Sequence, residues 1–172
     1  MSRQAVLRSG SNRAIFCIML FIAVMASSRS IAPPSASADT ITATWYTLSS
    51  VWVNKGEAKT VSGGRNQIQF VRGSLSQGAQ VTIMERDPSA CDVIVGPDGM
   101  GLSKAAVLTI SYAGSTQELS APNLKLYRLN GGTGVWELVS GTNDFSHKNF
   151  SAKIMVLGRY MLSPISPGKA GW

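Results

Sequence analysis

The sequence predicts an all-β protein, an antiparallel β-sandwich of about eight to nine short strands. Two observations predict this fold: runs of β-branched and large apolar residues recur at short intervals, and each run is bounded by Gly, Pro, Asn or Ser. The clearest run is Val107–Tyr112. It follows the tight turn Gly96–Gly99, in which proline presets φ and the closing glycine accepts a positive φ.

The first 38 of the 172 residues have the composition of a signal peptide. Arginines precede an apolar run of thirteen residues (14–26), and Ala36-Ser37-Ala38 forms a small-x-small cleavage signal. A spanning helix needs about 20 apolar residues, so the length of this run favours a cleaved leader over the alternative, a retained N-terminal anchor. We therefore expect cleavage near Ala38, no membrane span afterwards, and export to the periplasm, the cell surface or the medium.

Loss of the leader changes the net charge. Four of the sixteen Lys and Arg residues lie before Asp39 and all nine acidic residues lie at or after it, so the mature chain carries twelve basic and nine acidic side chains, a net charge of +3 rather than +7. No basic run remains, which argues against nucleic acid or an anionic membrane as partner. The one cysteine left, Cys91, has no intrachain partner, and we expect it to be buried and inert.

The rest of the chain divides into three parts. Residues 39–56 form an N-terminal extension with a Thr- and aromatic-rich edge strand at 41–48, residues 57–163 form the sandwich, and residues 164–172 form a Pro-punctuated, disordered tail. Trp136 follows the Gly-rich hairpin loop 130–134 and is expected in the core, opposite Leu126 or Tyr127. The strands expected within the sandwich are 59–62, 67–71, 80–85, 91–95, 107–112, 124–129, 135–139, 149–156 and 160–163.

Several segments of the sandwich together carry a family resemblance. They are Gln67–Phe70, Gly73–Leu75, Val81–Ile83, Gly96–Gly99 with Ser103-Lys104, Val107–Tyr112, Leu124–Arg128, Gly134–Val139 and Arg159–Leu162. In this order and spacing, the segment from Glu57 to Ser163 resembles the ZU-5 domain, the β-sandwich of zonula-occludens, netrin-receptor and ankyrin proteins, in its bacterial exported version. The resemblance implies a non-catalytic interaction module.

Some signalling members of that family cut themselves at a His-Phe-Ser triplet just before the last strand. In that reaction the serine hydroxyl attacks the preceding carbonyl. The corresponding positions here are Val156-Leu157-Gly158, which contain neither the hydroxyl nor the histidine. We therefore expect no self-cleavage.

Three aromatic residues ahead of the sandwich, Trp45, Tyr46 and Trp52, are the candidate binding surface. Exposed aromatic rings on a rigid platform stack on sugar rings or on partner side chains. The alternative is that these rings cover one sheet edge and protect it from strand pairing. The expected partner is a protein or a cell-envelope glycan. A further alternative is that the chain completes another subunit by strand addition, which predicts concentration-dependent association.

The rival functional class is a small extracellular hydrolase or transpeptidase that uses Cys91 and His147. His147 is the only histidine, and it lies in Asp144-Phe145-Ser146-His147-Lys148, where neighbouring residues of one turn do not face each other as a triad requires. A sortase-type enzyme has its histidine before its cysteine, the reverse of the order found here. A polar loop accounts better for this segment, so we expect no catalytic residue and no enzyme activity.

Three aspartates, Asp87, Asp92 and Asp98, lie near one another in the sequence and offer oxygen ligands for calcium. They lack the every-second-residue spacing and the trailing glutamate of an EF-hand loop. Roles in turns and on the surface account for them, so we expect no metal and no cofactor.

Overall fold

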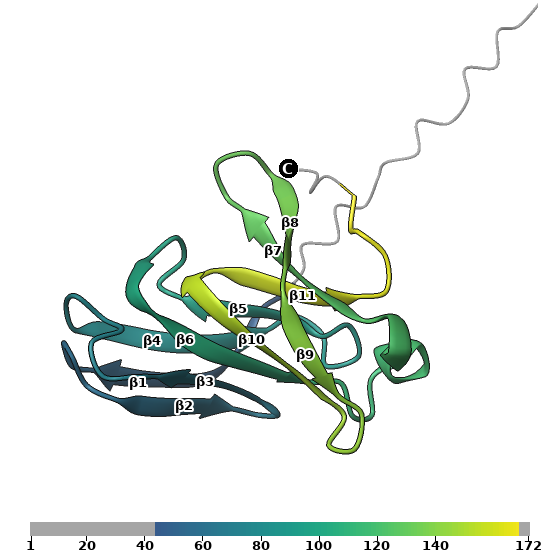
Figure 1. Cartoon of the computed structure of the whole chain (residues 1–172), viewed down its shortest axis with the longest axis horizontal. Coiled ribbons are helices and arrows are strands. Elements are labelled where there is room, and N and C mark those ends of the chain that lie inside the picture. Colours follow the sequence, from purple (N-terminus) through teal and green to yellow (C-terminus); the bar gives the residue numbers. More distant parts are fainter. Residues whose placement is uncertain (1–43, 169–172) are drawn as a thin grey trace, which may run out of the picture. The chain divides into compact units, whose positions relative to one another are not determined.

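A computed structural model describes residues 44–168, and these residues form the predicted β-sandwich (Figure 1). The six-stranded sheet has the order β1-β4-β5-β11-β7-β8 and the five-stranded sheet has the order β2-β3-β6-β10-β9, with antiparallel pairing throughout. The strands are β1 (Tyr46–Val53), β2 (Lys59–Gly63), β3 (Asn66–Phe70), β4 (Ala79–Glu85), β5 (Asp92–Gly96), β6 (Gly101–Ser111), β7 (Lys125–Asn130), β8 (Val135–Val139), β9 (Gly141–Asp144), β10 (Asn149–Val156) and β11 (Arg159–Ser163).

The core lies between the two sheets and follows from the alternation of the strands. In β3, Ile68 and Phe70 are buried while Gln67 and Gln69 are exposed, and in β4 Val81 and Ile83 are fully buried. Alternate residues of a strand point to opposite faces, so each strand gives one apolar face to the core. The inner faces of both sheets contribute to one continuous apolar cluster. The alternation in the sequence therefore predicted the buried face of these two strands correctly.

An edge strand overlaps the C-terminal half of the strand predicted at 41–48 and extends beyond residue 48. Within the described residues, strand β1 begins at Tyr46 and pairs with β4 from Tyr46↔Glu85 to Val53↔Ala79. Residues 41–43 of the predicted strand lie outside the described residues. Although β1 lies in the predicted extension, it is hydrogen-bonded into the six-stranded sheet.

Strands β8 and β9 form one path that changes sheets at Ser140. Strand β8 pairs with β7 in one sheet, and β9 pairs with β10 in the other (Figure 1). The sequence did not predict β9. The structure also has a 3₁₀ helix, η1 (Thr116–Asn123), where a loop was expected.

Two expected positions need correction. Trp136 is buried, but it pairs with Leu129 and lies outside the apolar cluster between the sheets. Cys91 is fully buried as predicted, but it lies just before β5 in a left-handed conformation with φ 51° rather than inside the strand.

The predicted signal peptide (1–38) and the last residues of the predicted tail lie outside the described residues. Among residues 44–168, no helix combines the length and apolar character needed to cross a membrane.

Candidate binding surface on the edge strand

The three predicted aromatic residues lie toward opposite ends of β1. Trp45 and Tyr46 are at its start and Trp52 is near its end. Tyr46 and Trp52 are six positions apart in extended chain, a distance of about 20 Å at the rise of a β-strand. The structure therefore does not bring the three rings into one surface, and each ring has its own environment.

Trp45 lies over a buried ion pair. The Arg159 guanidinium is 5.1 Å from the centroid of the Trp45 ring and 5.2 Å from that of the Trp136 ring. It donates two hydrogen bonds to Asp92, from Nε to Oδ1 at 2.9 Å and from Nη2 to Oδ2 at 2.6 Å. We call Trp45, Asp92, Trp136 and Arg159 the Arg159 clamp. Because the Trp45 ring stacks on Arg159, the clamp explains its position without a ligand.

Trp52 remains 53% exposed, yet its indole is held in one place. Its Nε1–H donates to Asn54 Oδ1 at 3.0 Å, which fixes the ring plane. The ring lies over Gly78, where a Cβ atom would be 2.8 Å from Trp52 Cζ2. No other residue type leaves room for the indole in this position.

The turn after β1 ties down the backbone of Trp52 as well. Asn54 donates to Glu57 Oε2 through its backbone N–H at 2.8 Å and through its side-chain amide at 3.0 Å. These bonds, the backbone one first, lower the pKa of Glu57 from its ordinary value. Lys59 Nζ donates to the Trp52 carbonyl at 2.9 Å and lies 3.5 Å from Glu57 Oε1. The indole and the backbone of Trp52 are therefore both anchored.

Polar side chains flank the indole on the outer face of the six-stranded sheet. Gln80 is directly opposite Trp52 across the β1–β4 pair, and its Nε2 donates to Ser50 Oγ at 2.8 Å. Thr82 is opposite Ser50 and shares the same face. We call Ser50, Trp52, Gln80 and Thr82 the Trp52 surface. It combines one apolar ring with amide and hydroxyl groups, the pattern that binds a sugar by stacking and hydrogen bonding.

The sequence named only Trp52 from this surface. Alternation in β4 places Gln80 and Thr82 on one outward face, so the sequence alone was enough to predict that this face is polar. The pairing of β4 with β1, and the closeness of Gly78 to the indole, depend on the tertiary fold and left no local signal in the sequence.

Cys91 is enclosed between the sheets. Its Sγ is 3.8 Å from the Ser111 carbonyl, to which it donates, and 3.7 Å from Arg65 Nη2. Burial raises the pKa of the thiol above its ordinary value. The side chain is therefore held as a protonated thiol, the less nucleophilic form.

His147 lies in an exposed turn between β9 and β10. Its Nδ1 is 2.7 Å from Asp144 Oδ2 and 3.1 Å from Ser146 Oγ, while the Ser146 hydroxyl lies 2.6 Å from Asp144 Oδ1. Bonds from Ser146 and then His147 hold the pKa of Asp144 far below its usual range. In a catalytic triad the serine and the aspartate contact different ring nitrogens. Here both contact Nδ1, so the three residues stabilise a turn.

The three aspartates considered as calcium ligands have separate contacts. Asp87 Oδ1 accepts from the Ser89 backbone N–H at 2.8 Å, and Asp92 belongs to the Arg159 clamp. Asp98 lies against Gly158, where a Cβ would be 2.9 Å from its Oδ1. Within residues 44–168, no three His, Cys, Asp or Glu residues lie close enough to hold one metal ion.

The link between β10 and β11 contains the positions at which the ZU-5 resemblance places self-cleavage. Leu157 is fully buried, its N–H donates to Met100 at 2.8 Å, and its carbonyl accepts from Gly99 at 2.9 Å. The Gly158 carbonyl accepts from the Val95 N–H at 2.9 Å. These bonds tie the link to the turn between β5 and β6.

Comparison with known proteins gives no identity. No protein-family model matches this chain, and no curated protein matches it. The two sheets define the fold class as an all-β sandwich.

Proposed function

We propose that this protein is an exported, non-catalytic β-sandwich module of ZU-5-like character that binds a neutral cell-envelope glycan through the Trp52 surface. The observation that carries the proposal is the indole of Trp52, which is half exposed and fixed by Asn54 and Gly78. A fixed ring loses little conformational freedom when a ligand binds, so more of the contact energy appears as affinity.

The neighbours of Trp52 favour a glycan over a protein. An aromatic hot spot for protein binding lies at the centre of a well-packed interface that excludes water. Trp52 instead has the Gln80 amide and the Ser50 hydroxyl beside its ring on the same face. A 2.8 Å hydrogen bond between these two groups holds them in place. The aliphatic face of a pyranose fits the ring, and its hydroxyl groups fit the polar side chains.

The position of the Trp52 surface at the edge of the sheet also suits a long polymer. Strand β1 is the outermost strand of the six-stranded sheet, so a glycan chain can cross the surface and continue past the edge. The predicted signal peptide supports the same proposal, because it would deliver the module to the compartment that contains envelope polysaccharides.

Co-sedimentation with insoluble polysaccharides tests the proposal. The purified protein is incubated with peptidoglycan, chitin or cellulose, and the bound fraction is measured against protein concentration. Trp52→Ala is expected to weaken binding about tenfold or more, because truncation of an aromatic hot spot costs about 2 kcal/mol or more. Gly78→Ala is expected to weaken binding in the same direction, because its new Cβ would displace the indole.

Gly131→Ala is the matched control, since a Cβ at this hairpin position meets no atom within 4 Å. It should bind like the unmodified protein. Thermal unfolding of each variant checks that the fold is retained. The proposal fails if the unmodified protein is retained by none of the polysaccharides, or if folded Trp52→Ala binds as well as the unmodified protein. If the protein instead binds a purified envelope protein saturably, and this binding requires Trp52, then the partner is a protein rather than a glycan.

A further inference from the structure

Two rows of residues on the outer face of the five-stranded sheet are mostly polar and contain a single charged side chain. Outward-facing residues of its five strands line up across the sheet in two rows through their pairing register. One row contains Ser62, Gln67, Thr109, Ser151 and Thr142, and the other contains Thr60, Gln69, Val107 and Lys153. With strands about 4.8 Å apart, the longer row extends over about 19 Å, enough for an extended oligosaccharide.

Lys153 is the one charged residue in these two rows, and it points outward because its neighbours Ala152 and Ile154 are buried. No ion pair or hydrogen bond of its ammonium group is present among residues 44–168. Glu137 lines an adjoining groove together with Lys153, but its two oxygens accept from Arg128 at 2.6 Å and from Asn130 at 2.7 Å. The ammonium group is therefore available to an external anion.

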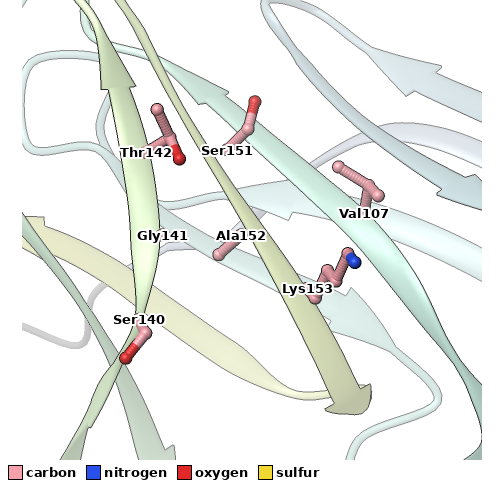
Figure 2. A pocket seen from close by; sticks show the side chains of 7 residues that line it. All are labelled: Val107, Ser140, Gly141, Thr142, Ser151, Ala152 and Lys153. Carbon is pink, nitrogen blue, oxygen red and sulfur yellow. The ribbon is translucent and has the colours of Figure 1, made fainter.

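A shallow hollow of about 610 Å³ lies beside Lys153, and Figure 2 shows the residues that line it. They come from β6, β9, β10 and the Ser140 corner: Val107, Ser140, Gly141, Thr142, Ser151, Ala152 and Lys153. The chain runs from β8 through Ser140 into β9, and β9 pairs with β10 from Gly141 onward. The hollow lies where this pairing begins. The lining therefore includes three hydroxyl groups, from Ser140, Thr142 and Ser151, and the ammonium group of Lys153.

We propose that this hollow is a second binding site, specific for a carboxylate-bearing polysaccharide. Lys153 binds a carboxylate, and the hydroxyl groups of Ser140, Thr142 and Ser151 bind the hydroxyls of the adjacent sugar rings. A charge-assisted hydrogen bond among neutral ones supplies the preference for acidic over neutral chains. The lack of other charges in the two rows leaves Lys153 as the residue that determines specificity.

The site is independent of the Trp52 surface. The Trp52 surface lies on the outer face of the six-stranded sheet, and the hollow lies on the outer face of the five-stranded sheet, with the core between them. Occupation of both sites would join a neutral and an acidic chain through one domain. Loss of either site should leave the other intact.

Affinity electrophoresis tests the second site with native gels that contain polygalacturonate, carboxyl-reduced polygalacturonate or dextran sulfate. The unmodified protein is expected to be retarded by polygalacturonate. Lys153→Gln should raise the apparent dissociation constant about tenfold, the size expected for one charge-assisted contact. Lys153→Arg should restore most of the binding. Because Lys153 is exposed, thermal unfolding of both variants should be close to that of the unmodified protein.

Lys55→Gln is the matched control, because it removes one positive charge in the turn after β1, outside the two rows. It should leave retardation by polygalacturonate unchanged. The proposal would be overturned if Lys55→Gln and Lys153→Gln lost binding to polygalacturonate equally, or if dextran sulfate retarded the protein as strongly as polygalacturonate. Either result would mean that binding depends only on net charge. Undiminished retardation by the carboxyl-reduced polymer would also overturn it. Trp52→Ala should retain binding to polygalacturonate, so failure of the Trp52 surface is distinguishable from failure of this site.

Discussion

The Arg159 clamp gives the sharpest prediction for stability. Arg159→Met keeps most of the side-chain volume but removes both hydrogen bonds to Asp92 and the positive charge beside Trp45 and Trp136. The carboxylate of Asp92 would then remain buried without a partner, because its side chain is only 3% exposed. We expect the variant to fold with a much lower free energy of unfolding.

The magnitude follows from burial. Removal of one partner of a buried ion pair costs about 3–5 kcal/mol. The Arg159 side chain is 23% exposed, which favours the lower part of that range, and two lost cation–π contacts add about 1 kcal/mol together. The expected loss is therefore about 3–4 kcal/mol. This is a large share of the 5–15 kcal/mol typical of a domain.

Urea unfolding followed by tryptophan fluorescence measures this loss. With a slope near 2 kcal/mol per molar urea, the midpoint should fall by about 1.5–2 M. Arg128→Met is the matched control: Arg128 pairs with Glu137, which is 44% exposed, so its loss should cost under about 1 kcal/mol. The double variant Asp92→Leu/Arg159→Met should recover part of the loss, because no unpaired carboxylate stays buried.

A loss below about 1 kcal/mol in Arg159→Met would refute the reasoning, as it would mean that Asp92 reaches solvent once Arg159 is gone. A double variant less stable than Arg159→Met would refute it too. In that case the packing of the rings on the guanidinium, rather than the buried charge, would dominate the clamp.

Two further predictions concern buried ionisable groups. Burial raises the pKa of Tyr160 to about 12, so the folded protein holds this proton more tightly than the unfolded chain, whose tyrosine pKa is about 10. This difference contributes about 2–3 kcal/mol to the free energy of unfolding below pH 10, and the contribution should be lost between about pH 10 and 12. The urea midpoint of Tyr160→Phe should therefore fall less steeply at alkaline pH than that of the unmodified protein. Parallel curves of midpoint against pH would contradict this. Cys91 should resist a soluble thiol reagent in the native protein and react fully in urea, and rapid native labelling would contradict its burial.

The sequence was sufficient for the fold class because alternation decides which side of a strand is buried. Gln67–Phe70 and Gln80–Ile83 show this period clearly, and the structure buries Ile68, Phe70, Val81 and Ile83. Strand β9 was missed since Gly141, Asn143 and Asp144 have low strand propensity. Its extended form depends on pairing with β10, where Gly141 fits against Phe150 with no room for a Cβ.

The candidate site was only partly predictable for a similar reason. An aromatic-rich run identifies rings that could bind, but their exposure depends on what the fold places beside them. Trp45 is next to Arg159, which is distant in the sequence, whereas Trp52 meets Gly78 and stays half exposed. The two outward rows that contain Lys153 are also invisible without the order of the strands.

The Arg159 clamp also determines how the domain meets mechanical load. Trp45 directly precedes β1, and Arg159 begins β11, which lies inside the six-stranded sheet. Tension applied through the N-terminal segment therefore reaches an interior strand as well as edge strand β1. Under such tension, this arrangement would keep β1, which supplies Ser50 and Trp52, from being peeled away first.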